Sequence, residues 1–593
     1  MSIDSKIAAF RQLLINHKIS AYIIPSSDPH QGEYVADHWK GRAWISGFTG
    51  SAGTAAITMD AAGVWTDSRY FIQGEKQLEG SAFELHKVYN QGSPQYIDWI
   101  IHNLDEGETV GCDGRLFSKS QLTSLEKKLT NKKLKLDATH DFLSEIWHDR
   151  PDLPKEPIFE LNVSFAGETR SSKLKRIRSQ MKEHNADIHL VSTLDDIAWI
   201  YNIRGKDIQY NPVAYAYTLI SHNSATLFID NEKVPEELTK MLEIDGIKIL
   251  PYDGIWRALN EISEEKSIWI DSSTISYSMA KAINTKKIIN KRLPSIKMKA
   301  IKNEVEIQHF RNVMKKDGVA LLKFYRWLEA NVDSELSEYD LVRKIAKFRS
   351  QQPGYQSESF GAIVGYKENG AIVHYSPSAE DSAIIKSSGV LLIDSGGQYL
   401  DGTTDITRTI TLGIPSDEER DAYTRVLKGN IALDRAVFPE GTLGVQLDTL
   451  ARFSLWENQM NYLHGTGHGV GFFLNVHEGP QGFHPGIASR SKNSIDEHMI
   501  TTNEPGYYAS GKFGIRIENC LLTVKSGSSD SGKFFKFETL TLFPIDTSLI
   551  EMSLMNKAEI DWLNEYHEVV FKQLSSNLEA DEIQWLKKKC AAL

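Results

Sequence analysis

The sequence predicts an α/β (α+β) protein in which two related N-terminal α/β domains precede a larger C-terminal domain. Helix and strand patterns alternate along the first half of the chain, and the same order of patterns occurs there twice. A chain of 593 residues is also too long for a single hydrophobic core. We therefore expect domains at residues 1–150, 151–297 and 298–593.

The first predicted domain contains four helix or strand patterns before its boundary. They are an amphipathic helix, an apolar strand, a Gly-rich region of turns and strands, and a Lys-rich helix, at residues 7–14, 21–25, 47–64 and 122–129. Residues 148–157 then carry three prolines, which exclude a helix interior because proline lacks an amide proton. We expect this stretch to be an interdomain linker.

The second predicted domain repeats the opening order of the first. A basic helix at residues 172–184 leads into an apolar strand at residues 187–191, and another strand follows at residues 225–229. The third domain begins with a long amphipathic helix, residues 304–328. Helical patterns return within residues 560–589, so we expect an appended helical tail.

Charge and cysteine content narrow the class of protein. A formal net charge of −11 gives no support for binding to nucleic acid or to an anionic membrane. The first residues lack a basic stretch followed by an apolar run, and no apolar segment is long enough to span a bilayer. Three cysteines far apart in the sequence exclude a disulfide framework and a cysteine-based zinc site. We predict a cytoplasmic protein.

Five side chains in the last third of the chain are the strongest candidate for a functional site. Four are carboxylates and one is an imidazole: Asp394, Asp405, His468, Glu504 and Glu518. Oxygen-rich ligands with one nitrogen suit a pair of hard divalent cations. Four carboxylates held together without cations would repel one another, whereas two dications would neutralise them and activate water. The set therefore predicts a two-metal hydrolase.

Local patterns indicate how these side chains meet. Asp394 ends an apolar strand, and a second strand at residues 399–412 is expected to form a hairpin with it and to carry Asp405. Glu504 precedes a Pro-Gly turn at the end of another strand. Glycines on both sides of His468 permit tight backbone geometry. Each residue alone has an ordinary alternative as a turn residue or a buried histidine, but unrelated structural roles would not produce the ordered set.

The segments that carry these residues resemble those of metallopeptidases with the pita-bread fold, a group that includes methionine aminopeptidase, prolidase and aminopeptidase P. They are residues 393–397, 404–409, 464–469, 503–506 and 514–519. The resemblance is strongest to the long, three-domain cytosolic aminopeptidase P (Xaa-Pro aminopeptidase) family, which is also matched at residues 46–53, 65–71, 473–480 and 562–567. It implies two creatinase-like N-terminal domains followed by a pita-bread catalytic domain with a C-terminal helical tail.

The resemblance implies a division of roles among the five residues. Asp394 would bind one metal ion, His468 and Glu504 would bind the other, and Asp405 and Glu518 would bridge the two. The family is usually manganese-dependent, so two Mn²⁺ ions are the expected cofactors. A metal-bridging hydroxide would attack the carbonyl before proline, and Glu504 would deliver a proton to the leaving nitrogen. Peptides with proline at the second position would be the substrates, and the chain would form a homodimer.

The resemblance also points to three further histidines and an arginine. His374 and His477 match positions that contact substrate and would hydrogen-bond its carbonyl or the tetrahedral intermediate. His464 matches a position proposed to shuttle protons or shape the pocket. Arg516 shares a strand face with Glu518 and would orient that carboxylate. The alternatives are histidines bonded to backbone, a loop-bracing His464 and an ordinary strand arginine.

Other features leave two interpretations open. Residues 367–370 depart from the Gly-Pro-Asn-Gly of many relatives at the rim of the expected pocket. Asp67 and Arg69 either help to close a neighbouring active site or form an ion pair within the first domain, which we favour. Trp456 lies on an amphipathic helix and is expected to pack in the core, although relatives make a dimer contact there.

Related proteins provide four alternative functions. A prolidase would take only Xaa-Pro dipeptides, but prolidases generally have one N-terminal domain. Methionine aminopeptidase usually lacks both, and creatinase replaces the metal carboxylates. A non-catalytic peptide- or protein-binding pita-bread protein would have lost ligands, and all five are present here. We therefore predict a metalloaminopeptidase that cleaves the bond between an N-terminal residue and a following proline.

Overall fold

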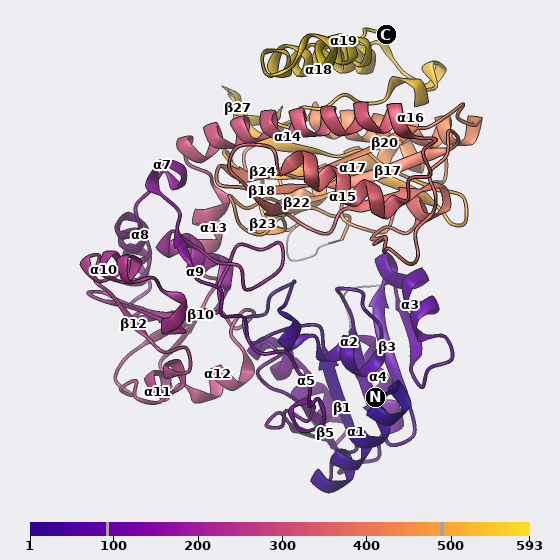
Figure 1. The fold of residues 1–593 in the computed structure, drawn as a ribbon. Helices are drawn as coiled ribbons and strands as arrows, with labels where there is room; N and C mark the ends of the chain where they lie inside the picture. The colour runs from indigo at the N-terminus through magenta and orange to yellow at the C-terminus, as the bar shows by residue number, and fades with distance from the viewer. Residues whose placement is uncertain (90–93, 487–490) are drawn as a thin grey trace. The chain divides into compact units, whose positions relative to one another are not determined.

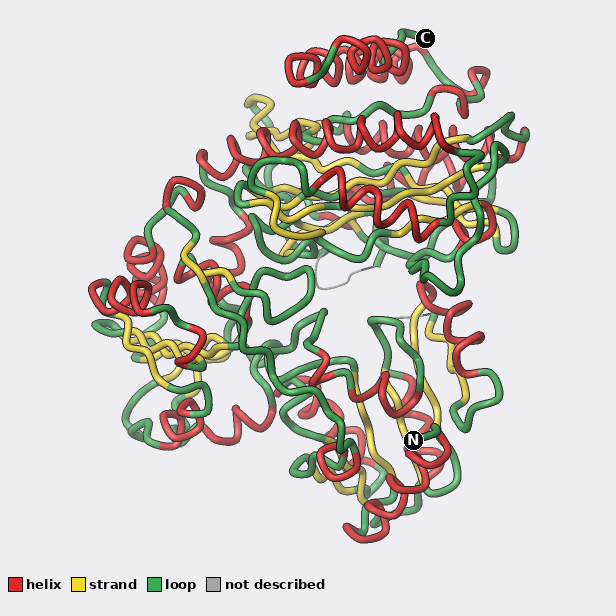
Figure 2. Tube along the Cα trace, in the orientation of Figure 1, coloured by secondary structure: helices red, strands yellow, loops and turns green. Residues whose placement is uncertain are grey.

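The computed structural model describes residues 1–89, 94–486 and 491–593. The chain divides into two compact units. Unit 1 comprises residues 1–162 and 168–296, and unit 2 comprises residues 163–167 and 297–593. Figures 1 and 2 show the helices and strands of each unit, which mix throughout, as the predicted α/β (α+β) class requires.

The first half of unit 1 is built on a six-stranded sheet of order β4-β3-β2-β1-β5-β6. The central strand β1 pairs antiparallel with β2 and parallel with β5. The strands are β1 Ala21–Pro25, β2 Thr54–Thr58, β3 Ala62–Asp67, β4 Glu84–Val88, β5 Thr109–Cys112 and β6 Lys135–Asp137. Helices α1 (Ile3–His17) and α5 (Lys119–Asn131) match the predicted helices, and α1 buries Ile7, Phe10 and Leu14 in the core of this half.

The second half of unit 1 repeats this plan strand for strand. Its sheet has the order β12-β11-β10-β8-β13-β14, and the central strand β8 pairs antiparallel with β10 and parallel with β13. The strands are β8 Ile188–Val191, β10 Ala216–Ser221, β11 Ala225–Ile229, β12 Ile247–Leu250, β13 Ile268–Ile270 and β14 Ile288–Asn290. Helix α8 (Arg170–Glu183) precedes β8 as α1 precedes β1. The predicted pair of related domains is therefore confirmed, and residues 148–157 between them carry no helix or strand.

Unit 2 opens with the long helix α14 (Glu304–Asn331), which Figure 1 shows beside the strands of this unit. Asn303 and Glu306 form a capping box that satisfies the first amides of this helix. Three helices and two sheets of this unit surround the candidate site residues in the sequence. The helices are α15 (Glu338–Arg349), α16 (Asp417–Asp434) and α17 (Gly444–Trp456). The sheets have the orders β16-β17-β20 and β21-β28-β27-β24-β22-β23.

The predicted hairpin is present, but its second strand is interrupted. Strand β17 (Val390–Ser395) pairs antiparallel with β20 (Ile406–Thr411), and Asp394 lies opposite Thr407. The single strand expected at residues 399–412 is wrong, because β18 (Gly397–Tyr399) and β19 (Gly402–Thr403) join β15 (Tyr355–Glu358) in another sheet. Asp405 lies where the chain crosses from one sheet to the other, outside both ladders.

The chain ends in two helices, α18 (Lys557–Leu574) and α19 (Ala580–Lys589), as the sequence predicted. In α18, Leu563, Val570 and Leu574 are buried, so the tail packs on the rest of unit 2 through an apolar face. Among the helices of the described residues, none combines the length and apolar character needed to cross a membrane.

Candidate metal centre

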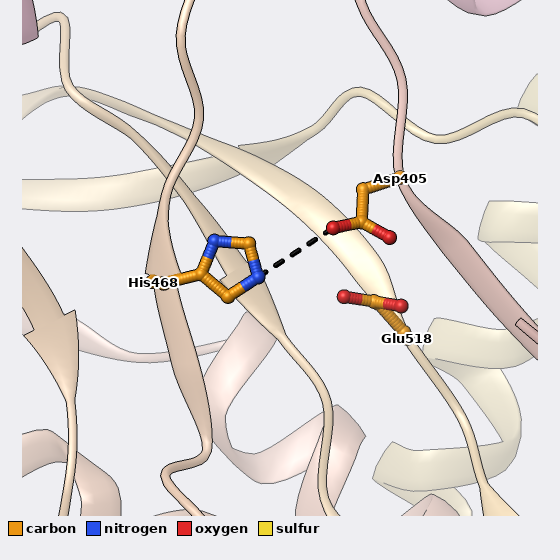
Figure 3. A group of neighbouring side chains, drawn as sticks. All are labelled: Asp405, His468 and Glu518. Atoms are coloured by element: carbon orange, nitrogen blue, oxygen red, sulfur yellow. Dashed lines mark ion pairs between the residues drawn. The ribbon is translucent and has the colours of Figure 1, made fainter. Parts of the chain in front are cut away.

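Three of the five candidate ligands converge from separate elements of unit 2 (Figure 3). Asp405 precedes β20, His468 lies in β22 (Gly467–Gly469), and Glu518 lies between β26 (Phe513–Arg516) and β27 (Asn519–Ser529). One ligand atom from each lies within 4.8 Å of the others. His468 Nε2 is 3.5 Å from Asp405 Oδ2 and 3.6 Å from Glu504 Oε1, and Glu504 follows β24 (Ile500–Asn503). The structure therefore brings together four of the predicted ligands.

The fifth candidate, Asp394, joins the group through hydrogen bonds. Arg516 Nη2 donates to Asp394 Oδ2 at 2.6 Å, and Arg516 Nε donates to Thr407 Oγ1 at 3.2 Å. Thr407 in turn donates to Glu518 Oε2 at 2.8 Å. The other oxygen, Asp394 Oδ1, is buried and has no hydrogen-bond partner among the described residues. A buried carboxylate oxygen without a donor is costly in a protein alone, but it is available to a cation.

The imidazole of His468 is oriented for metal binding. Its Nδ1 lies 2.9 Å from the carbonyl oxygen of Gly469, which can only accept a hydrogen bond. Nδ1 therefore carries the proton, and the lone pair of Nε2 faces Asp405 and Glu504. The flanking glycines are required by space, since a Cβ on Gly467 would lie 1.9 Å from the carbonyl oxygen of Thr502.

The electrostatics of the centre favour cations. Burial raises the pKa of the Asp405 carboxyl well above its usual range, and the charges of Asp394 and Glu504 raise it further. The pKa of Glu518 is raised in the same way, mainly by burial and further by the charges of the neighbouring carboxylates. Arg516 contributes one positive charge against four carboxylates, so the residues present suit a pair of dications.

Two of the predicted substrate histidines adjoin this centre. The rings of His477 and His468 pack edge to face, with centroids 4.2 Å apart. His464 Nδ1 lies 2.7 Å from the carbonyl oxygen of Gly465, and its Nε2 lies 2.8 Å from the hydroxyl of Tyr508. His464 thus makes a contact of the loop-bracing kind, which was the alternative to its expected role in the pocket.

Tyr508, on β25 (Gly506–Ala509), is a residue that the sequence reasoning missed. Its hydroxyl accepts a hydrogen bond from Arg516 Nη1 at 2.7 Å, and burial raises the pKa of Tyr508 to about 12. It thus connects His464 to the arginine that holds Asp394. The sequence did offer a signal: Tyr508 lies four residues after Glu504, and in an extended segment residues i and i+4 point to the same face. Arg516 contacts Asp394 directly and is linked to Glu518, the carboxylate it was expected to orient, through Thr407.

The remaining predicted histidine, His374, is half-buried and follows the short helix η4 (Lys367–Ala371). The hydroxyl of the next residue, Tyr375, donates to Glu338 Oε2 at 2.7 Å. At the predicted rim, Lys367 has a φ of 48°, the left-handed conformation that suits glycine.

Two other sequence expectations meet different outcomes. The ion pair between Asp67 and Arg69 is present, with Arg69 Nη2 2.7 Å from Asp67 Oδ2. The core position expected for Trp456 is wrong, because 44% of this side chain is exposed at the end of α17. The buried face of α17 is formed by Leu447, Ala451 and Leu455, which recur every fourth residue, and Trp456 lies outside this face.

Comparisons with known proteins cover the whole chain. A family model described as the creatinase/prolidase N-terminal domain matches residues 6–144, and a second model of that description matches residues 149–306. The model of metallopeptidase family M24 matches residues 308–525, and the model of its C-terminal region matches residues 533–593.

Individual relatives match over nearly their full length. The "Probable Xaa-Pro aminopeptidase P" of Laccaria bicolor is 41% identical over 99% of this chain and 93% of its own. The "Xaa-Pro aminopeptidase 1" of Dictyostelium discoideum is 40% identical over 100% and 97%. The crystal structure of an X-prolyl aminopeptidase from Caenorhabditis elegans, described as a cytosolic enzyme with a di-nuclear active site, superposes with a TM-score of 0.95 at 35% identity over all of both chains. The chain therefore belongs to the Xaa-Pro aminopeptidase family, within metallopeptidase family M24.

Proposed function

We propose that this chain is an aminopeptidase that hydrolyses the peptide bond between an N-terminal residue and a following proline. The observation that carries this function is the convergence of Asp405, His468 and Glu518 in a chain that matches named Xaa-Pro aminopeptidases from end to end. A prolidase is the weaker candidate, because the named Xaa-Pro aminopeptidases match this chain over nearly all of its length, including both N-terminal domains.

The proposed cofactors are two divalent cations, with Mn²⁺ as the preferred metal. Asp394 would hold one ion, His468 and Glu504 the other, and Asp405 and Glu518 would be shared. The donor chemistry supports this assignment, because carboxylates with one imidazole suit Mn²⁺ and similar hard cations. The buried Asp394 Oδ1 without a donor and the raised pKa values of Asp405 and Glu518 support it too. When bound, the ions would lower the pKa of a water molecule and polarise the scissile carbonyl.

The side chains of this site would then position and transfer protons. Glu504 would accept a proton from the attacking water and deliver it to the proline nitrogen as the bond breaks. His477, beside His468, and His374 would donate hydrogen bonds to the carbonyl oxygen as negative charge develops there. Arg516 would keep Asp394 in place, and His464 would shape the pocket through Tyr508.

A peptide assay tests the proposed activity. Xaa-Pro-Yaa tripeptides should lose their first residue, a chelator should abolish the reaction, and added Mn²⁺ should restore it. Hydrolysis confined to Xaa-Pro dipeptides would identify a prolidase instead. Absence of stoichiometric divalent metal in the purified protein, together with peptide binding, would identify the non-catalytic alternative. Peptides with alanine in place of proline serve as the specificity control.

We also propose that the chain forms a homodimer through the outer face of α17. This face carries Leu450, Phe453 and Trp456, which are 37%, 59% and 44% exposed and recur every third residue. Contiguous exposed apolar side chains of this kind support a protein interface.

The substitution Phe453→Asp is therefore expected to give a monomer, because a desolvated carboxylate would oppose burial of the face. Analytical ultracentrifugation measures the change. Ile414→Asp is the matched control, since Ile414 is 97% exposed and lies outside α17. A Phe453→Asp variant that sediments as the wild type does would contradict the proposed interface.

Two further proposals concern location and organisation. A cytoplasmic location is supported by the free thiols of Cys112, Cys520 and Cys590 and by the cytosolic description of the Caenorhabditis elegans enzyme. Domain boundaries at residues 150 and 297 are supported by the repeated sheets and by the change of family model between residues 144 and 149.

A further inference from the structure

Two lysines are buried where the chain enters unit 2: Lys299 in the last turn of α13 (Pro294–Ala300) and Lys302 between α13 and α14. Lys299 is 3% exposed and Lys302 is 1% exposed. The backbone amide of Lys302 donates to the carbonyl oxygen of His498 at 3.0 Å, and Ile301 forms an isolated bridge with Met499. The segment is thus fastened to the residues that lead directly into β24 and Glu504. Burying two ammonium groups is costly, so their partner is informative.

Both lysines face one buried carboxylate, that of Glu478. Lys302 Nζ donates to Glu478 Oε1 at 2.5 Å and to the carbonyl oxygen of Lys299 at 3.0 Å. Lys299 Nζ lies 4.0 Å from Glu478 Oε2. Glu478 is itself 1% exposed, so the cluster is sealed from solvent and its charge-assisted hydrogen bond is geometrically defined.

Glu478 is the residue directly after His477, the first of strand β23 (Glu478–Phe483). Its backbone pairs with Gly469, the neighbour of His468. The carboxylate therefore anchors the peptide unit that carries the His477 imidazole, and that imidazole packs on the His468 ring. Small errors in the placement of such a group are expensive in rate, because catalytic hydrogen bonds need sub-ångström positioning.

We propose that Lys302, through its ion pair with Glu478, is a positioning residue that holds His477 over the metal centre for hydrolysis. Lys299 places a second positive charge beside the same carboxylate. This role rests on the proposed aminopeptidase activity only where kcat is measured; the reactivity of His477 can be measured without turnover. It explains why a charged cluster is retained in a buried position where an apolar cluster of similar volume would fold at least as well.

The substitution Lys302→Met tests this role without leaving Glu478 unpaired. Methionine keeps most of the side-chain volume, and the remaining Lys299 balances the Glu478 charge. We expect kcat on an Xaa-Pro-Yaa tripeptide to fall about tenfold or more, with KM and metal content little changed. In the metal-free protein, diethyl pyrocarbonate should modify His477 several-fold faster than in the wild type, because the imidazole is released from its fixed position.

A double-mutant cycle separates positioning from general stabilisation. If Lys302 acts through His477, adding Lys302→Met to His477→Ala should lower kcat no further. Lys233→Met is the matched control, because Lys233 is 2% exposed and pairs with the buried Asp207 in unit 1. It should lower the unfolding temperature and leave kcat and His477 reactivity unchanged.

Two results would overturn the proposal: unchanged His477 reactivity in Lys302→Met, or kcat losses that add in the double variant. The reactivity measurement needs no turnover, so it stands even if the wild type fails to cleave Xaa-Pro bonds. That failure would count against the proposed function alone.

Discussion

Asp405→Ala is expected to remove both metal retention and turnover. Asp405 lies where the chain crosses between two sheets, and its carboxylate faces His468 and Glu518. We propose that it binds both ions. A metal centre supplies several kcal/mol of transition-state stabilisation, so kcat should fall at least about 1000-fold. Metal content by inductively coupled plasma mass spectrometry and tripeptide hydrolysis measure the two effects.

Asp401→Ala is the matched control for that variant. Asp401 lies four residues earlier, is also buried, and pairs with Lys316 at 2.7 Å instead of facing the centre. It should keep its metal and its rate at temperatures where it is folded. Full activity in Asp405→Ala would count decisively against the proposed site.

His477→Ala is expected to separate the chemistry from metal binding. The ring packs on His468, and its assigned role is to donate a hydrogen bond to the carbonyl oxygen of the reacting bond. Loss of one such donor lowers kcat by about 100- to 1000-fold in well-studied enzymes. Metal content should stay at the wild-type level, since the five assigned ligands are all retained.

His484→Ala controls for the general effect of removing a half-buried histidine from the same strand region. The His484 ring accepts a hydrogen bond from the amide of Gly486, a local contact within the loop. Its loss should leave kcat close to the wild-type value. Metal loss in His477→Ala would instead assign that residue to the ligands.

Local patterns predicted the elements that depend on neighbouring residues. Strand β1 has the predicted bounds because five apolar residues stand between a helix and a polar turn. The repeat of helix, strand and turn along the sequence predicted that the two halves of unit 1 share one plan. The same reasoning failed at residues 399–412, where alternation suggested a continuous strand. Sheet membership there depends on partners far away, β15 for one part and β17 for the other.

The candidate ligands could be named from the sequence because carboxylate and imidazole chemistry is written in residue types and short motifs. Their geometry could not. Arg516 donates a hydrogen bond to Asp394, 122 residues away in the sequence, and Lys302 donates one to Glu478, 176 residues away in the sequence. Tyr508 gains its meaning only from its contacts with His464 and Arg516.

The amino-acid sequence alone thus determined the class of fold and the repeat of the N-terminal domains, since both depend on periodicity within a few residues. It also named the candidate ligands, through residue types and short motifs that resemble those of a known family. Tertiary structure decided that Arg516 binds Asp394, that Asp405 lies between two sheets and that Lys302 pairs with Glu478 next to His477. Those choices depend on distances between segments that are remote along the chain, and such distances are set by packing of the whole unit.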